Sequence, residues 1–408
     1  MHVALYSPGW PFENATSGIV TYVHWVRTEL QRMGHRVSLI TATRQRDEAE
    51  RIYGIDSGLL RRMVRRLRLK LGIDRDLVFT VGSRIAEEAV RIHRRDPIDV
   101  LEMEESFGWA ADVISRNRFP LVVKLHGPAF LTIPQDEADS QAGFVRRRIA
   151  AEGAGLAAAR VITAPSRCTL ESAIARYALE PAIRTKVVNP LALDPGARLW
   201  SAHASRRDTI LFVGRFDKAK GADRVLLGFR ELLAQRPELR LDFVGPDMGI
   251  RAENGTLVYF EDYVRSLFSA SDASKINYLG RQSRDVISSL RCKAAVTIVA
   301  SRWETQGYTA LEAMLQGCPL VCADTSGLSE SVEHGVTGLL FQSDDVAEIA
   351  RHVRVLLDDA EMAQNLGRRA REYVLATHAP SRVVAQTLDV YRAAISDFRR
   401  HGSRDSRH

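Results

Sequence analysis

The chain has 408 residues, of which 45% are hydrophobic and 26% are charged. A chain of this length is expected to form two domains, and its hydrophobic fraction excludes an intrinsically disordered protein. The 57 Lys and Arg residues exceed the 50 Asp and Glu residues, which gives a formal net charge of +7. This mild excess suits an anionic ligand or surface, but it is too small to demand nucleic acid as a partner.

Segments that would direct the chain into or across a membrane are not evident. No apolar run approaches the ~20 residues that span a bilayer, and the first residues lack the pattern of a secretory signal. The spacing of the cysteines matches neither a disulfide scaffold nor a zinc site, so we expect a cytoplasmic, reduced protein. These cysteines are Cys168, Cys292, Cys318 and Cys322.

Short apolar runs alternate with helical patterns along the first half of the chain. This alternation predicts a doubly wound parallel sheet. The first helix is predicted to end at Gly34 and to have one apolar face. That face contains Ile19, Tyr22, Val23, Val26, Leu30 and Met33. The predicted strands are 3–6, 36–41, 98–103, 121–125, 160–163 and 186–188.

The same alternation restarts after a polar stretch, 191–207, which we expect to join two domains. We place the first domain at 1–195, the second at 196–379, a terminal amphipathic helix at 380–400 and a polar tail at 401–408. The apolar residues of this helix are Val384, Leu388, Tyr391, Ile395 and Phe398. The strands predicted in the second domain are 209–213, 241–244, 276–279, 296–300, 320–322 and 339–341.

The predicted fold class is therefore α/β, with two Rossmann-like domains facing a cleft. Open α/β sheets bind their ligands at the carboxyl ends of the strands. We expect the chemistry to lie in the loops that directly follow strands.

Two glutamates eight positions apart follow the strand predicted at 296–300. Glu304 lies in the loop, where it can accept hydrogen bonds from sugar hydroxyls, and Glu312 lies in the helix, where it can reach a ribose. Gly307 permits close backbone approach, and the N–H groups of Tyr308 and Thr309 begin a helix, which favours phosphate. Taken alone, the glutamates are better explained without a function, with Glu304 as a helix cap and Glu312 as a solvated helix residue.

A second motif, Gly214-Arg215 with Lys220-Gly221, follows the strand predicted at 209–213. Arg215 and Lys220 can converge around the turn on one diphosphate and stabilise the negative charge that grows as it departs. The alternative is that both are solvated surface cations. Because both motifs follow strands, the functional interpretation is favoured.

These motifs resemble those of the GT-B glycosyltransferases of glycosyltransferase family 4. The segment from Glu304 to Glu312 is similar to the Glu-x7-Glu signature of that family, and Gly317-Cys318-Pro319 is similar to its Gly-x-Pro turn. Gly34-His35-Arg36-Val37, His126-Gly127, Ser166, Asn189 and Gly338-Leu339-Leu340 also occur in family order. The segment Arg302–Gln306 departs from the common pattern, which leaves the donor sugar open.

The resemblance implies a retaining enzyme that uses a nucleoside-diphosphate sugar as its donor substrate, with no further cofactor and no metal ion. Arg215 and Lys220 would bind the diphosphate together with the loop at Gly214. Glu304 would contact the transferred sugar, and Glu312 would hold the ribose. Residues 1–195 would face the acceptor, residues 196–379 would bind the donor, and Glu330 resembles a family position near the donor.

The first domain contributes further candidates. Gly18 begins the first helix, where it would let the backbone approach a diphosphate or an acceptor, although it also suits a plain helix start. His126 follows the strand at 121–125, and by the resemblance it would contact the donor sugar. Glu104 and Glu105 end another strand and are weaker candidates for binding an acceptor, since solvated carboxylates would look the same.

The most basic segment is 59–71, which has apolar residues on one helical face and arginines on the others. Such a helix could rest on an anionic membrane from the cytoplasmic side. Packing of its apolar face into the first domain is slightly favoured, since the segment contains no Trp or Phe.

The favoured function is transfer of a sugar to a glycan or lipid-linked acceptor in bacterial surface polysaccharide or glycolipid synthesis. The alternatives are a small-molecule acceptor, or a sugar-nucleotide epimerase or phosphorylase-like enzyme of the same fold. A basic membrane- or nucleic-acid-binding protein is disfavoured, since no aromatic-rich basic stripe occurs. A dehydrogenase is disfavoured because no G-x-G-x-x-G follows a strand.

Overall fold

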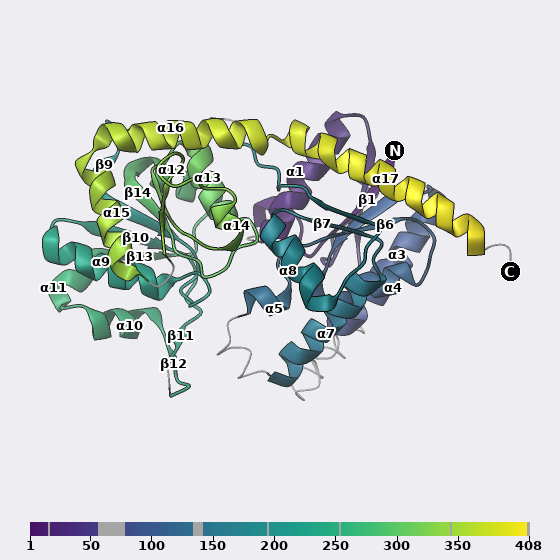
Figure 1. Ribbon diagram of the computed structural model, residues 1–408, viewed down its shortest axis with the longest axis horizontal. Helices are drawn as coiled ribbons and strands as arrows, with labels where there is room; N and C mark the ends of the chain where they lie inside the picture. The colour runs from purple at the N-terminus through teal and green to yellow at the C-terminus, as the bar shows by residue number, and fades with distance from the viewer. Residues whose placement is uncertain are drawn as a thin grey trace. The chain divides into compact units, whose positions relative to one another are not determined.

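The computed structural model describes residues 1–14, 17–55, 78–133, 142–193, 196–252, 254–342 and 345–405 (Figure 1). It divides into two compact units. Unit 1 combines Met1–Pro190 with Pro380–His408, and unit 2 is Leu191–Ala379. The change of unit lies five residues before the predicted boundary at 195. The basic segment 59–71, with its predicted membrane contact, lies within 56–77, outside the described residues.

Unit 1 is built on an eight-stranded sheet in the order β3-β4-β2-β1-β5-β6-β7-β8. All neighbouring strands are parallel except β3 and β4. The predicted doubly wound α/β class is confirmed. The strands are β1 (His2–Ser7), β2 (Arg36–Thr41), β3 (Arg46–Asp47), β4 (Ile52–Gly54), β5 (Val100–Glu104), β6 (Leu121–Lys124), β7 (Val161–Ala164) and β8 (Ile183–Lys186).

Sequence periodicity missed or displaced the strands at the sheet edges. The prediction of a strand at 186–188 was wrong by about three residues, because β8 alternates half-buried and exposed residues instead of forming a buried apolar run. The two-residue strand β3 is polar and pairs only with β4, so no hydrophobic pattern marks it. The central strands β1 and β5 are buried along their whole length, which is why their apolar runs were visible.

Helices pack around this sheet. The first of them, α1, starts after Ser17, whose side chain accepts a hydrogen bond from the Ile19 N–H, and it buries the predicted apolar face. Met33, predicted on that face, instead caps the helix end and is 41% exposed. The helices of unit 1 are α1 (Gly18–Arg32), α3 (Val81–Arg95), α4 (Ala110–Ile114), α5 (Ala129–Thr132), α7 (Ala142–Ala158), α8 (Arg167–Tyr177) and α17 (Pro380–Asp405).

The terminal helix α17 belongs to unit 1 although unit 2 precedes it in the chain (Figure 1). It contacts α1, β5 and β6. Val384, Leu388 and Tyr391 are buried as the pattern predicted. Near its end, Asp397 accepts two hydrogen bonds from the Arg160 guanidinium, at 2.6 and 2.9 Å. The bidentate pair fixes the helix against the start of β7.

Unit 2 is built on a six-stranded parallel sheet in the order β13-β10-β9-β14-β15-β16. All six strands occur where apolar runs predicted them. They are β9 (Arg206–Val213), β10 (Arg240–Val244), β13 (Ile276–Gly280), β14 (Ala294–Val299), β15 (Leu320–Ala323) and β16 (Leu339–Phe341). A small antiparallel pair, β11 (Ile250–Arg251) and β12 (Leu257–Val258), lies apart from this sheet.

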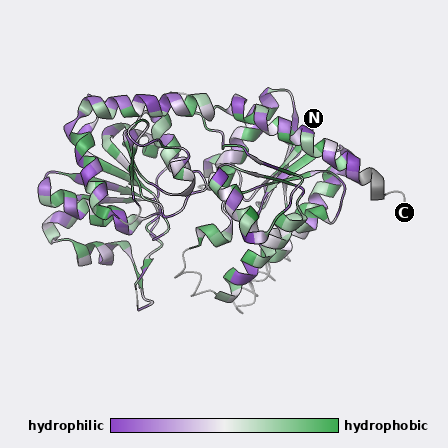
Figure 2. Ribbon diagram, viewed as in Figure 1, coloured by the Kyte–Doolittle hydropathy of each residue, from purple (hydrophilic) through white to green (hydrophobic). Residues whose placement is uncertain are grey.

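Hydrophobic residues concentrate on the strands, and the helices turn polar faces outward (Figure 2). Among the described residues, none of the helices combines the length and apolar character needed to cross a bilayer. The helices of unit 2 are α9 (Ala222–Gln235), α10 (Phe260–Leu267), α11 (Ala270–Ala273), α12 (Arg284–Lys293), α13 (Tyr308–Gln316), α14 (Ser326–Ser329), α15 (Val346–Asp358) and α16 (Ala360–Thr377).

The attachment of α17 to unit 1 can be tested at Leu388. Leu388 is 2% exposed, so Leu388→Ala is expected to remove buried apolar surface and lower the free energy of unfolding by about 2–4 kcal/mol. The matched control is Gln386→Ala at an exposed position of the same helix, with an expected change within about 0.5 kcal/mol. Thermal unfolding followed by circular dichroism compares them, and equal midpoints would contradict the packing.

Candidate functional site

The site in unit 2 begins with two loops that follow neighbouring strands. Strand β9 pairs in parallel with β14, so the loops after Val213 and Val299 emerge at the same edge of the sheet. A Cβ atom on Gly221 would lie 1.9 Å from the Ala300 carbonyl oxygen, and the residue has a φ of 67°. The first loop can therefore pack against the second only with glycine at this position.

An ion pair connects the two predicted motifs across these loops. The Lys220 Nζ lies 2.5 Å from the Glu304 Oε1, although the two residues are 84 positions apart. The Lys220 side chain is 33% exposed, so the ammonium keeps one side open to solvent. The structure thus brings together two residues that the sequence analysis placed in separate motifs.

Glu304 is held from several directions. Ser301 Oγ donates to its Oε1 at 2.8 Å, and Ser326 Oγ accepts from its backbone N–H at 2.9 Å. The backbone N–H of Gly327 donates to its carbonyl oxygen at 2.9 Å. A Cβ on Gly327 would lie 2.0 Å from the Thr305 carbonyl oxygen. The carboxylate is consequently preorganised before any ligand arrives.

Arg215 is more loosely placed. Its Nε lies 2.7 Å from the Asp217 Oδ2, and its side chain is 49% exposed. Asp217 also accepts a hydrogen bond from the Lys220 backbone N–H at 2.7 Å, so one carboxylate organises both cationic positions. Gly214 packs under this loop, since a Cβ there would lie 3.4 Å from the Lys220 Cβ.

The helix α13 starts at Tyr308, directly after Gly307. Gly307 has a φ of 78°, and a Cβ at this position would lie 2.5 Å from the Leu328 side chain. The turn therefore favours glycine. It starts α13 only four residues after Glu304, so the first amides of the helix, at Tyr308 and Thr309, belong to the same loop-to-helix segment as that carboxylate. Such amides carry the positive end of the helix dipole.

Glu312 has a partner that the sequence analysis did not anticipate. Its Oε2 accepts a hydrogen bond from the buried Arg291 guanidinium at 2.5 Å, while the Glu312 side chain is 30% exposed. One carboxylate oxygen is committed to holding the side chain, which leaves the other for a ligand hydroxyl. Burial and the Glu312 carboxylate raise the pKa of Tyr308 well above its usual value.

The remaining donor candidate, Glu330, ends the short helix α14 and is half-buried. Its carbonyl oxygen accepts a hydrogen bond from the Tyr373 hydroxyl at 3.4 Å. Its predicted donor role stays a prediction.

In unit 1, the predicted residues gather at the carboxyl ends of β1, β5 and β6. Gly18 is exposed at the first position of α1. The His126 ring packs edge-to-face on Tyr22 at 4.9 Å, and burial together with the nearby Lys124 ammonium holds the pKa of His126 well below its usual value. The imidazole is therefore neutral at neutral pH.

Glu104 and Glu105 are adjacent in sequence but point to different surroundings. Glu105 is 2% exposed and accepts hydrogen bonds from the backbone N–H groups of His126 and Gly127, at 2.9 and 2.8 Å. It therefore fixes the loop that carries His126. Glu104 lines an open hollow in unit 1.

Sequence reasoning missed the residues that hold the site in place. Arg291 lies in the last turn of α12, whose sequence looks like that of any solvated helix, and Ser326 begins the short helix α14, directly before a glycine. Ser326 has a φ of 44°, a conformation that sequence alone does not reveal. The local sequence signal for this position was the Ser326-Gly327 pair that follows β15.

Two family models match this chain. "Glycosyl transferase 4-like domain" matches residues 17–190, and "Glycosyl transferases group 1" matches residues 201–373. The first match lies within unit 1 and the second within unit 2. Together they cover both predicted motifs and the loops of unit 1 described above.

Curated relatives share between 26% and 31% sequence identity with this chain over the matched regions. A D-inositol 3-phosphate glycosyltransferase of Streptomyces avermitilis is 31% identical over 47% of this chain and 40% of its own length. One of Nocardioides sp. is 26% identical over 77% of this chain and 72% of its own length. A glycogen synthase of Mycobacterium tuberculosis is 31% identical over 48% of this chain and 46% of its own length. The matched region thus spans under half of the first and third relatives.

Solved structures match nearly the whole chain. A sucrose-phosphate synthase of Thermosynechococcus elongatus has a TM-score of 0.73 and 20% identity, over 97% of this chain and 99% of its own. HepE of Anabaena, in complex with UDP and glucose, has a TM-score of 0.63 and 15% identity, over 96% of this chain and 100% of its own. These likenesses establish the fold. With two Rossmann-like units and a family model matching each, the chain belongs to the GT-B-fold glycosyltransferases of family 4.

Proposed function

We propose that the protein is a retaining glycosyltransferase that moves a sugar from a nucleoside-diphosphate sugar to an acceptor hydroxyl. The observation that supports this most directly is the ion pair between Lys220 and Glu304 at the carboxyl ends of β9 and β14. It places a cation suited to a phosphate beside a carboxylate suited to sugar hydroxyls. In a nucleoside-diphosphate sugar the phosphate adjoins the sugar, so a cation for the phosphate and a carboxylate for the sugar hydroxyls would have to lie side by side.

Stabilisation of the departing diphosphate is the main catalytic contribution in this proposal. Breaking the bond between the anomeric carbon and the phosphate leaves negative charge on the phosphate oxygens. Lys220, Arg215 and the first amides of α13 would receive that charge, and preorganised groups stabilise it without reorganisation. These side chains supply the positive charge that a metal ion would otherwise provide, so the proposal includes no metal.

Glu304 and Glu312 would position the donor. Glu304, fixed by Ser301 and Ser326, would accept hydrogen bonds from hydroxyls of the transferred sugar. Glu312, anchored on one side by Arg291, would accept from the ribose with its other oxygen. His126 is proposed to contact the sugar as a neutral hydrogen-bonding group, since its low pKa disfavours the imidazolium.

Retention requires the acceptor oxygen to join the face of the sugar that the phosphate leaves. The new bond forms between the acceptor oxygen and the anomeric carbon as the bond to phosphate breaks. The acceptor proton would pass to an oxygen of the departing phosphate. This route, which the family membership suggests, needs no carboxylate nucleophile.

The acceptor class is proposed from chemistry alone. A glycan or lipid-linked acceptor of a bacterial cell surface is the preferred assignment, and a small molecule is the alternative. The curated relatives include both kinds by name, a glycogen synthase and inositol phosphate glycosyltransferases. A cytoplasmic enzyme, in contact with the inner face of the membrane through 59–71, would suit the first assignment.

Removal of the Lys220 ammonium tests the diphosphate site. Lys220→Ala is expected to lower turnover by at least ~100-fold, because developing phosphate charge loses a preorganised partner. Lys275→Ala is the matched control, since Lys275 also forms an ion pair, with Asp272 at 2.9 Å, but precedes β13 at the opposite edge of the sheet. Turnover is measured after a thermal-shift panel of nucleoside diphosphates has identified the base. Near-normal turnover in Lys220→Ala would refute the assignment.

Replacement of Glu304 separates sugar from nucleotide recognition. Glu304→Gln keeps the side-chain shape but removes the charge, so it should reduce the extra stabilisation that a nucleotide sugar gives over the bare nucleoside diphosphate. Stabilisation by the diphosphate itself should persist, because Lys220 remains. Thermal shifts with UDP and UDP-glucose, or the pair chosen by the panel, measure the difference. Loss of both shifts together would argue against a sugar contact.

A further inference from the structure

A hollow of about 520 Å³ opens in unit 1 beside the ends of β1, β2 and β5. Its described walls include Trp10, Phe107 and Trp109, and one ionisable group, Glu104, lies among them. None of the described residues that line it is a lysine or an arginine. The hollow is large enough for one or two sugar-sized rings.

Glu104 presents an unused oxygen to this hollow. The residue is 3% exposed, and its Oε2 accepts a hydrogen bond from Ser106 Oγ at 2.9 Å. Within the described part of the chain, no hydrogen bond reaches its other oxygen. A ligand hydroxyl in the hollow could donate to this oxygen, and hydrogen bonds to a carboxylate are stronger than those between neutral groups.

The wall residue Phe107 is held in an unusual backbone conformation. Its φ of 54° is left-handed, which is uncommon for a residue other than glycine. Its backbone N–H donates to the Glu152 Oε1 at 3.4 Å, and the Arg148 guanidinium lies 4.4 Å from its ring centroid. Its ring also stacks on Trp109 at 5.2 Å. Strain maintained by several contacts is typical of functional positions.

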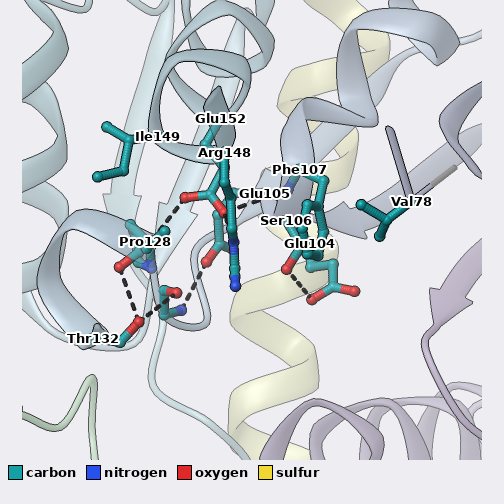
Figure 3. A network of polar contacts seen from close by, with 12 residues as sticks. Val78, Glu104, Glu105, Ser106, Phe107, Pro128, Thr132, Arg148, Ile149 and Glu152 are labelled. Atoms are coloured by element: carbon teal, nitrogen blue, oxygen red, sulfur yellow. Dashed lines mark hydrogen bonds and ion pairs between the residues drawn. The ribbon is translucent and has the colours of Figure 1, made fainter. Parts of the chain in front are cut away.

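Figure 3 shows how α7 supports this wall. Arg148 and Glu152 reach from the helix toward the loops after β5 and β6, and the Arg148 Nε donates to the Glu152 Oε1 at 2.8 Å. Glu152 also accepts from the Ala129 backbone N–H at 2.7 Å. The Trp109 indole donates to the Val78 carbonyl oxygen at 2.7 Å. The aromatic walls are therefore fixed in place before a ligand binds.

When Glu104 is ionised, the hollow disfavours an anionic ligand. Glu104 is the one ionisable group among the described lining residues, and the Arg148 guanidinium behind the wall is already paired with the buried Glu152 at 2.8 Å. The helix α1 also begins at the hollow, but its Ile19 N–H is already bonded to the Ser17 side chain. A phosphate here would meet a carboxylate and no free cation among the described lining residues.

On the acceptor side that the family membership implies for unit 1, we propose that this hollow selects an uncharged, hydroxyl-bearing ring and rejects a phosphorylated one. The inference rests on the proposed glycosyltransferase function and names the acceptor class. Glu104 accepts hydrogen bonds from ring hydroxyls, and Trp10 and Phe107 pack against the apolar faces of the ring. The relatives named for D-inositol 3-phosphate would thus differ from this chain in acceptor charge.

The experiment compares two pairs of probes that differ only by a phosphate. The full-length protein is titrated with myo-inositol and its 3-phosphate, and with glucose and its 6-phosphate, with ligand-observed NMR at pH 8. The wild type should bind the neutral member of each pair about tenfold more tightly. Glu104→Gln should weaken binding of the neutral probes about tenfold and strengthen binding of the phosphorylated ones, because the repulsive charge is gone.

The opposite signs of these two changes distinguish a contact from a structural role, which would weaken all four probes together. Glu87→Gln, at an exposed position of α3, is the matched control and should leave all four affinities unchanged. Tighter binding of a phosphorylated probe by the wild type would overturn the proposal, as would no binding of any probe. The thermal shift with a nucleoside diphosphate, measured on the same samples, reports donor binding separately, so failure of the acceptor proposal is distinguishable from failure of the proposed function.

The same carboxylates predict a pH dependence of stability. Burial raises the pKa of Glu104 to about 7 and that of Glu105 to about 8, against an ordinary value of 4.5, and repulsion from Glu152 adds to both. The folded chain keeps these protons at pH values where the unfolded chain has lost them. The contribution of Glu104 and Glu105 to the free energy of unfolding therefore falls as the pH rises from about 4.5 to about 8. Other charged or titratable side chains at this cluster include Tyr6, His126 with the nearby Lys124, Arg148 and Tyr177.

The thermal midpoint measured from about pH 5 to about pH 8 tests this dependence. Glu104→Gln cannot ionise, so its midpoint should decline less steeply with pH than that of the wild type. Glu87→Gln should follow the wild type. Parallel declines in Glu104→Gln and the wild type would contradict the raised pKa of Glu104.

Discussion

The pairing of β9 with β14 is the constraint on which the proposed donor site depends. Two strands that are hydrogen-bonded in parallel release their loops at one edge, and this alone brings Lys220 within 2.5 Å of Glu304 across 84 positions of sequence. The glycine at 221 then allows the loops to touch, because a side chain there would overlap the Ala300 carbonyl. Neither loop carries both Lys220 and Glu304, so the ion pair at this edge depends on the order of the strands in the sheet.

Each charged group proposed to contact the donor already has a protein partner. Arg215 pairs with Asp217, Lys220 with Glu304, and Glu312 with Arg291. An unpaired charge in a half-buried loop would pay for its desolvation and move freely, whereas a paired one keeps a defined position. A diphosphate would therefore compete with carboxylates for the cations, and the partial exposure of Arg215 and Lys220 leaves room for it to do so.

The sequence predicted the fold class and the six strands of the second sheet, because buried parallel strands read as apolar runs, and it located the two motifs that the structure brings together after β9 and β14. It misplaced β8, whose exposed alternate residues hide the strand, and it gave no sign of the short strands β3 and β4. Arg291 and Glu152 were missed for a different reason. Each acts through a side-chain contact with a residue that is distant in sequence, and no local pattern encodes such a contact.

The two units differ in the charged groups that they present at the carboxyl ends of their strands. Unit 2 combines partly exposed cations with a helix start, which suits a diphosphate. Unit 1 sets one carboxyl group, that of Glu104, among aromatic rings, which suits hydroxyls and, once the group is ionised, disfavours phosphate. A transferase must keep its two substrates from exchanging places, and this electrostatic difference between the two sheets would contribute to that without any difference in fold. On this argument, a substitution that places a cation in the hollow of unit 1 would erode the discrimination between donor and acceptor even where the packing survives.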